Sequence, residues 1–268
     1  MVSISTRPVS VQQRVQKVAH LRDLLSELIV RDLKIRYQRS LLGIAWSWLK
    51  PLAQLLVLYF VFDYLMPMAV PNYATFLFAG VLAWNWFGSA TVASASSITS
   101  SPELVRRPGF PTRILPALVV SNEAIHFVLA LPILLVVAWW QTGFAGAALL
   151  ALPIVVVVQF LFTLSLCYGI AASHVRFRDT QDAVGIVIMV AFYLTPVFYS
   201  PGQFASGFDA LYLLNPMAQI LGAYRAIVIE HSWPNAFSLL GVLACSGLIM
   251  FASLRLFEHE SATFVEEL

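Results

Sequence analysis

Long apolar runs separated by short polar stretches fill the chain from residue 44 onward. Six runs stand out, at about residues 44–66, 73–99, 114–140, 146–173, 183–199 and 236–254. A helix needs about 20 apolar residues to cross the hydrocarbon core of a bilayer. The pattern therefore predicts an all-α integral membrane protein with six transmembrane helices, which form one domain over residues 44–268.

The first 43 residues have a different pattern. Between residues 11 and 39, apolar positions such as Val15, Val18, Leu21 and Leu25 recur at helical spacing, with basic residues between them. A cationic amphipathic helix of this kind lies in the membrane interface. We therefore expect residues 1–43 to be a cytoplasmic tail with an interfacial amphipathic helix. A flexible basic tail is the alternative.

Another apolar window, which begins at Asn215-Pro216, is too short to cross the bilayer. Residues 216–229 give only about fourteen helical positions, so we expect re-entrant or interfacial helices between spans five and six. Arg225 would be costly if it faced lipid, so this segment must rest on protein or line a cavity. Asn215, Pro216 and Arg225 are therefore candidates for an exit gate, and a plain outer loop is the alternative.

The basic residues indicate the orientation. With six spans, 15 of the 16 Lys and Arg residues fall on one side of the membrane, and only Arg225 falls on the other. The positive-inside rule makes the basic side cytoplasmic, so both termini of this multi-pass protein are expected inside the cell. Five or seven spans would scatter the basic residues over both sides.

Composition excludes several classes of protein. Charged residues make up 11% of the chain, apolar residues make up 59%, and the mean hydropathy is +0.80. A soluble domain carries about 25% charged residues, so a soluble enzyme or a nucleic-acid-binding protein is not expected. No GxxxxGK[ST] pattern occurs, so ATP would have to be bound by a separate partner.

Two polar connections on the cytoplasmic side could contact such a partner. Ser101-Pro102-Glu103 is a helix-start signal, and Pro108 ends the helix after about two turns. This helix is either a lever that docks on a partner or a tight connection. The second connection is 174–182, where Asp179 could contact a partner or only cap span five.

Several sequence motifs resemble those of one transporter family, the ABC type-2 permeases that export polysaccharides. They occur in the family's order along the chain. The motifs are Lys34-Ile35-Arg36-Tyr37, the stretch from Leu42 to Leu52 (LGIAWSWLKPL), Phe110-Pro111-Thr112-Arg113-Ile114-Leu115-Pro116, Arg176-Phe177-Arg178-Asp179, Thr195-Pro196-Val197-Phe198-Tyr199, and Leu214-Asn215-Pro216 with Tyr224-Arg225.

The resemblance implies a homodimeric permease in the bacterial inner membrane, paired with two ATP-binding cassette subunits. Such a complex would export a polyprenyl-pyrophosphate-linked polysaccharide, such as an O-antigen. The permease itself would have no catalytic site, cofactor or metal, and ATP and Mg would be bound by the partner. The residues that would contact the ATPase and form its coupling surface are Glu103, Leu104, Arg106, Arg107, Arg176, Arg178 and Asp179.

Two further sets of residues are compatible with a lipid-linked glycan. Basic side chains beside the first span could bind a pyrophosphate headgroup or attract anionic lipids in general: Arg31, Lys34, Arg36 and Arg39. Aromatic side chains could stack on sugars along a translocation path, although interfacial belts also account for such residues. The candidates for the path are Trp46, Tyr59, Trp84, Trp86, Phe87, Tyr193, Phe198 and Tyr199.

Two rival functions rest on a few ionisable residues. A membrane-embedded enzyme acting on lipid-linked substrates could use Glu123 with His126, or Glu230 with His231. An ion-coupled carrier could use Glu123 alone. The sequence provides no convergent set of catalytic groups for the first function. It also has no paired repeat of the kind on which many carriers are built.

Overall fold

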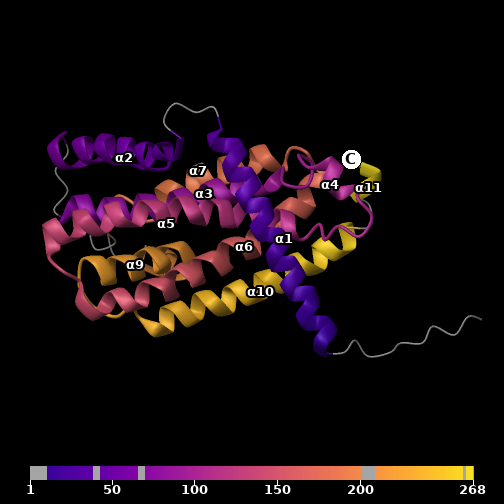
Figure 1. The fold of residues 1–268 in the computed structure, drawn as a ribbon. Coiled ribbons are helices and arrows are strands. Elements are labelled where there is room, and N and C mark those ends of the chain that lie inside the picture. Colours follow the sequence, from indigo (N-terminus) through magenta and orange to yellow (C-terminus); the bar gives the residue numbers. More distant parts are fainter. Residues whose placement is uncertain (1–10, 39–42, 66–69, 201–208, 262–263, 268) are drawn as a thin grey trace, which may run out of the picture. The chain divides into compact units, whose positions relative to one another are not determined.

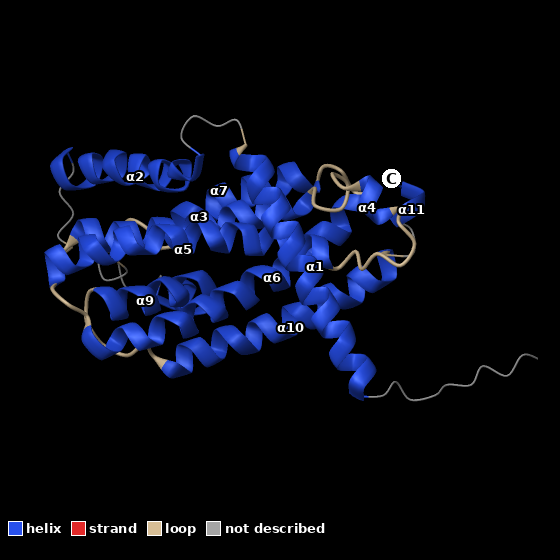
Figure 2. Ribbon diagram, in the orientation of Figure 1, coloured by secondary structure: helices blue, strands red, loops and turns tan. Residues whose placement is uncertain are grey.

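The structure is a computed structural model that describes residues 11–38, 43–65, 70–200, 209–261 and 264–267. Across these ranges the regular structure is helical, without a strand (Figure 2). The all-α class predicted from the sequence is therefore confirmed. The chain divides into two compact units, Met1–Gly43 and Ile44–Leu268.

The first unit contains one long helix, α1 (Val11–Tyr37). Its surface carries ion pairs between adjacent residues, with Arg22 and Asp23 3.0 Å apart and Arg31 and Asp32 3.1 Å apart. Exposed pairs of this kind add little stability, because water screens both charges. The helix predicted for this part of the chain is present, and its place in the membrane interface stays a prediction.

In the described part of the second unit, four helices are long and apolar enough to cross a membrane. They are α3 (Tyr73–Ala95), α5 (Ile114–Thr142), α6 (Leu152–Arg176) with the preceding turn η3 (Gly146–Ala151), and α10 (Ala236–Glu260). Two shorter apolar helices coincide with the other predicted spans, α2 (Trp46–Tyr59) and α7 (Thr180–Leu194). The number of six crossings stays a prediction.

Helix α3 lies at the centre of this unit. It packs against α2, α5, α6, α7 and also α9 (Pro216–Val228) (Figure 1). A helix surrounded in this way must be apolar on every side, and small residues must let its neighbours approach. Gly80 and Gly88 meet these needs, because a Cβ at Gly88 would already lie 3.1 Å from Ile188. The core therefore surrounds α3.

Side-chain hydrogen bonds attach α2 to its neighbours. Ser47 Oγ lies 2.9 Å from His126 Nδ1 on α5, and Trp48 Nε1 donates to the carbonyl of Leu129 over the same distance. About two turns further along α2, Gln54 Oε1 accepts from the Asn85 amide of α3 at 2.9 Å. Within a bilayer such polar contacts hold helices together, because apolar faces alone bind lipid equally well.

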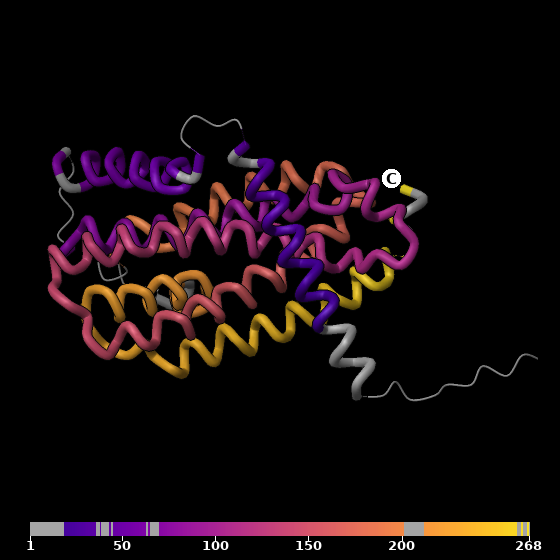
Figure 3. Tube along the Cα trace, in the orientation of Figure 1, coloured from indigo at the N-terminus to yellow at the C-terminus, as the bar shows by residue number. Residues whose placement is uncertain are grey.

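The chain's C-terminal end lies at one end of the bundle, together with the start of α5 and the end of α6 (Figure 3). Arg113 donates to Glu258 over 2.6 Å, and Arg176 lies 3.7 Å from Glu260. The Phe257 ring packs edge-on between Tyr168 and Phe264, which belongs to α11 (Phe264–Glu267). These contacts join α5, α6, α10 and α11 at this end.

Replacing Phe257 by alanine should destabilise the bundle, because the ring is fully buried. We expect a loss of about 3–5 kcal/mol, with a Tm lower by roughly 5–15 °C in detergent. Phe251→Ala on the same helix is the matched control, since that ring is 63% exposed. Equal shifts for the two variants in a thermal melt would contradict the packing described for this end.

Candidate functional site

The short helix α9 is buried inside the bundle. It follows α8 (Asp209–Leu214) and begins at Asn215-Pro216, as the sequence predicted. Asn215 Oδ1 accepts from the amides of Met217 at 3.0 Å and Ala218 at 3.3 Å, so it caps the first turn. The helix packs against α3, α5, α6 and α10. The expectation that this short segment rests on protein is therefore confirmed.

Arg225 fixes α9 to two other parts of the fold. Its guanidinium donates to the carbonyl of Pro196 at 2.7 Å and to that of Val197 at 2.8 Å. The Phe76 carbonyl of α3 lies 3.4 Å from two of its nitrogens, and the Phe76 ring centroid is also 3.4 Å from the guanidinium carbon. Carbonyl dipoles and a ring face compensate this charge, which is only 7% exposed.

A glycine makes this contact possible. A Cβ added at Gly80 would lie 2.7 Å from the Val197 oxygen and 2.8 Å from the Arg225 guanidinium. We call Phe76, Gly80, Arg225 and the segment 195–198 the arginine clamp. Sequence reasoning selected Arg225 but missed Gly80, because a glycine inside an apolar run gives no sign of what approaches it.

The segment that Arg225 holds is the end of the fifth predicted span. We expected that span to continue to about residue 199, but α7 ends at Leu194 and Thr195 is extended. Pro196 has no N–H to continue the helix, and its carbonyl is bound by Arg225 instead. Asn215 donates to the Thr195 hydroxyl at 2.9 Å, which further fixes this turn.

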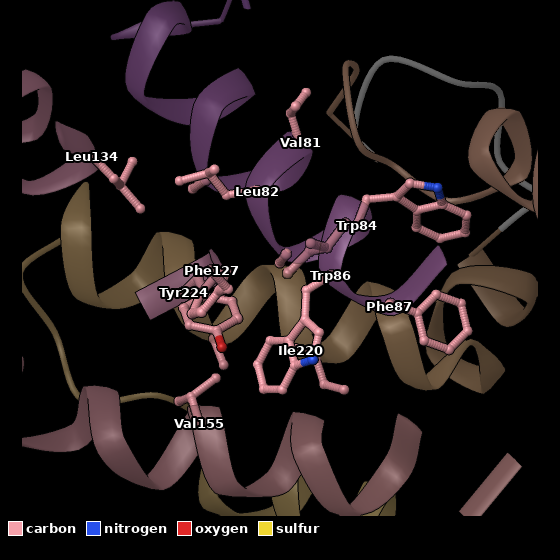
Figure 4. Close-up of a cluster of buried hydrophobic side chains, with 14 of the residues drawn as sticks. Val81, Leu82, Trp84, Trp86, Phe87, Phe127, Leu134, Val155, Ile220 and Tyr224 are labelled. Atoms are coloured by element: carbon pink, nitrogen blue, oxygen red, sulfur yellow. The ribbon is translucent and has the colours of Figure 1, made fainter. Parts of the chain in front are cut away.

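The aromatic path candidates fall into two groups. Trp84, Trp86 and Phe87 are between 2% and 6% exposed and lie in the core of this chain (Figure 4). Trp86 donates to the Val120 carbonyl at 3.3 Å. In contrast, Trp46 is 43% and Tyr193 is 63% exposed. The first three side chains therefore pack helices together, and which rings meet a substrate stays a prediction.

The remaining path candidates surround the end of α7. Phe198 packs against Tyr193, with ring centroids 6.1 Å apart, and against Tyr199 at 5.1 Å. The Tyr73 hydroxyl donates to the Phe198 carbonyl over 2.8 Å, and the Tyr73 ring stacks on Tyr59. Phe198 thus belongs to the arginine clamp, and Tyr59 and Tyr199 lie beside it, at the same end of α3.

The coupling candidates gather at the opposite end of the bundle. Helix α4 (Pro102–Val105) lies between α3 and α5, with Glu103, Arg106 and Arg107 exposed and Val105 buried. The two ion pairs described above bring the start of α5 and the end of α6 beside the end of α10. Arg178 and Asp179 are exposed in the turn after α6.

Two expectations about this end are wrong in detail. Helix α4 has one turn rather than about two: it ends at Val105, and the chain continues in turns in which Arg107 donates to the Leu104 carbonyl and Phe110 to that of Arg107, with Gly109 at φ +78°. Neither Ser101 nor Asp179 makes a capping side-chain hydrogen bond. The backbone of Asp179 is already helical, whereas a capping residue needs an extended conformation. The Thr180 hydroxyl donates to the Phe177 carbonyl at 2.6 Å instead.

The headgroup candidates belong to the first unit. Arg31 donates to its neighbour Asp32, and Lys34 is exposed. Arg39 and the side chain of Arg36 lie outside the described residues. Their role stays a prediction.

The residues proposed for the rival functions have structural contacts. His126 pairs with Ser47 between α5 and α2. His231 Nε2 lies 3.2 Å from the Thr142 hydroxyl, beyond the end of α9, and Glu123 is half-buried on α5. Contacts between helices account for both histidines, so neither rival function gains an observation in its favour.

Comparisons with known proteins point to one family. The model of the ABC-2 type transporter family matches residues 23–229, which include the arginine clamp. The chain is 35% identical to the O-antigen export system permease protein RfbA of Myxococcus xanthus, over 95% of this chain and 98% of that protein. A protein of the same name from Klebsiella pneumoniae is 28% identical, over 89% and 94%. The polysialic acid transport protein KpsM of Escherichia coli is 24% identical, over 91% and 93%.

Replacing Gly80 by alanine should loosen the arginine clamp. The added methyl group collides with the Val197 backbone and with Arg225, so we expect a loss of about 1–3 kcal/mol and a lower Tm in detergent. Gly241→Ala on α10 is the matched control, because no atom lies within 4 Å of a Cβ added there. A Gly80→Ala variant as stable as Gly241→Ala would refute the close approach.

Proposed function

The chain belongs to the ABC-2 type transporter family, and we propose that it is the permease subunit of an ATP-driven exporter of lipid-linked polysaccharide. The observation that carries this proposal is the similarity to an O-antigen export permease over almost the full length of both chains. The cargo is a glycan on a polyprenyl pyrophosphate, of the O-antigen class or a related surface polysaccharide. It moves across the bacterial inner membrane.

The energy comes from another protein in this proposal. The sequence has no P-loop pattern, so two copies of an ATP-binding cassette subunit bind ATP and Mg for a homodimer of this chain. They dock at the end of the bundle that carries α4, Arg176, Arg178 and Asp179. This end is cytoplasmic, because 15 of the 16 basic residues fall on its side of a six-span topology.

Motion of the docked subunits reaches the spans through short connections. Only residues 106–113 separate α4 from α5, so displacement of α4 moves the start of α5. Helix α5 packs against α6, and α6 packs against α10, so this displacement also reaches α10, beside the ion pair of Arg113 with Glu258. At the opposite end the arginine clamp fixes α9 to α3, so the exit segment moves together with the central helix.

The cargo enters at the cytoplasmic interface beside the first span. A pyrophosphate needs several cationic donors, and arginine offers two parallel hydrogen bonds to one phosphate. Arg31, Lys34, Arg36 and Arg39 lie within nine residues of one another and provide four such groups. The permease performs no chemistry on the glycan, and its residues bind, guide and release it.

Reconstitution tests this function directly. Proteoliposomes that contain the permease, its ATP-binding partner and a fluorescent lipid-linked glycan should translocate the glycan only when ATP is supplied. Equal transport by the permease without any ATPase would refute the proposal.

A charge reversal on α4 tests the docking surface. Glu103→Lys should abolish co-purification of the ATP-binding subunit, while insertion into the membrane persists, because the exposed carboxylate is replaced by a cation. Glu230→Lys is the matched control, since this exposed glutamate follows α9 at the other end of the bundle. Normal complex formation by the Glu103→Lys variant would show that α4 is not the docking helix.

A triple substitution tests the headgroup cluster. We expect the replacement of Arg31, Lys34 and Arg36 by glutamine to remove charge-assisted hydrogen bonds to the pyrophosphate. The glycan-lipid concentration needed to stimulate ATP hydrolysis should then rise by about tenfold or more. Arg22→Gln, elsewhere on α1, provides a control for general loss of basic charge. The cluster has no role in recognition if the dose–response curve of the triple variant does not shift.

A further inference from the structure

An apolar cavity opens beside the end of α9. Its volume is about 380 Å³, within the range of small-molecule pockets. The end of α5, the connection through residues 143–145, the turn η3 and the last residue of α9 form its walls. Its lining includes Leu135, Trp139, Phe144, Leu149 and Val228 and is almost entirely carbon.

Aromatic residues place this cavity at a membrane–water boundary. Trp139 is 66% exposed, Trp140 is 89% exposed and Phe144 is 74% exposed, all at the end of α5 or just after it. Exposed tryptophans of membrane proteins gather at the level of the lipid headgroups. A ligand seated here would therefore have its polar part at the interface and an apolar part between the helices.

One side of the cavity has a polar rim. Thr142 Oγ1 lies 2.7 Å from the Ala138 carbonyl and 3.0 Å from that of Val228, and His231 Nε2 lies 3.2 Å from the same hydroxyl. Glu230 precedes His231 and is exposed, and its carboxylate accepts from the Ser232 hydroxyl at 3.5 Å, so the loop that contains His231 also carries a negative charge. Arg225, one turn earlier, is occupied by three carbonyls and offers no free cation.

We propose that this cavity holds one acyl chain of a phospholipid whose headgroup carries an ammonium ion. A cavity lined by carbon loses dispersion contacts if it stays empty, and lipid chains surround it in the bilayer. The Glu230 carboxylate attracts an ammonium group such as that of phosphatidylethanolamine. It repels a headgroup of net negative charge, such as that of an anionic phospholipid, and a polyprenyl pyrophosphate most of all.

This lipid site plays no part in the proposed export of the glycan. It lies next to α9, which belongs to the proposed exit segment. Val228 ends α9 and lies one turn after Arg225, so a bound chain contacts the helix that the clamp holds. The bound phospholipid is thus a component of the folded exit segment and is distinct from the cargo.

Native mass spectrometry with defined lipids tests this proposal. The purified protein should retain one phosphatidylethanolamine per chain and should prefer it about threefold over phosphatidylglycerol. Ala145→Phe fills the cavity and should release that lipid, whereas Ala147→Phe, on the exposed face of η3, should not. Glu230→Gln should abolish the preference between the two lipids but leave one lipid bound.

A second variant covers the case in which Ala145→Phe does not fold. Val136 is 61% exposed at the mouth of the cavity, so Val136→Trp should block entry without disturbing the core. Two results would overturn the proposal: the same lipid count in the blocked variants as in Ala147→Phe, or displacement of phosphatidylethanolamine by an equal concentration of polyprenyl phosphate. Neither result bears on ATP-dependent export, which separates this test from that of the proposed function.

Discussion

A buried arginine charge determines how the short helix α9 can be placed. A guanidinium in the apolar core of a membrane protein must be bound by several acceptors, and carboxylates are not required for this. Arg225 donates to the carbonyls of Pro196 and Val197, which lie outside the helices. Those of Pro196 and Val197 are available because α7 ends at Leu194, and the Phe76 carbonyl accepts an additional contact from α9. The end of α7 before Pro196 thus provides the acceptors, and one arginine side chain uses them to fix the position of α9.

This constraint extends to the central helix. Arg225 reaches its acceptors only because Gly80 has no side chain, and α3 therefore carries a glycine where a leucine would otherwise add packing. Around it, Trp84, Trp86 and Phe87 fill the space between α3 and its neighbours. Large rings and small residues both occur along α3: the rings fill space between helices, and the glycines allow the close approach of α9 at Gly80 and of α7 at Gly88.

The positions of the helices could be predicted from the sequence, because they depend on periodicity. Details that depend on tertiary contacts could not. The apolar runs located the helices, and Asn215-Pro216 located the start of α9, because cap chemistry is local. The cap expected at Ser101 is absent, as is the capping that was one of two alternatives for Asp179, since the same residue types cap only with the right backbone angles. Burial of Trp84 and Trp86 could not be predicted, because interfacial, core and path-lining aromatics look alike in a single sequence.

The attachment of α2 has a mechanical consequence. The contacts of Ser47 and Trp48 with α5, and of Gln54 with Asn85, depend on hydroxyl, imidazole, indole and amide groups with replaceable partners. Most of the α2 side chains are at least partly exposed, whereas most of those of α3 are buried. Separation of α2 therefore breaks these hydrogen bonds together with the packing of Leu55 against the core, and it leaves the central helix covered by its other neighbours. The contacts between α2 and the rest of the bundle are thus partly polar, and such contacts can exchange one partner for another.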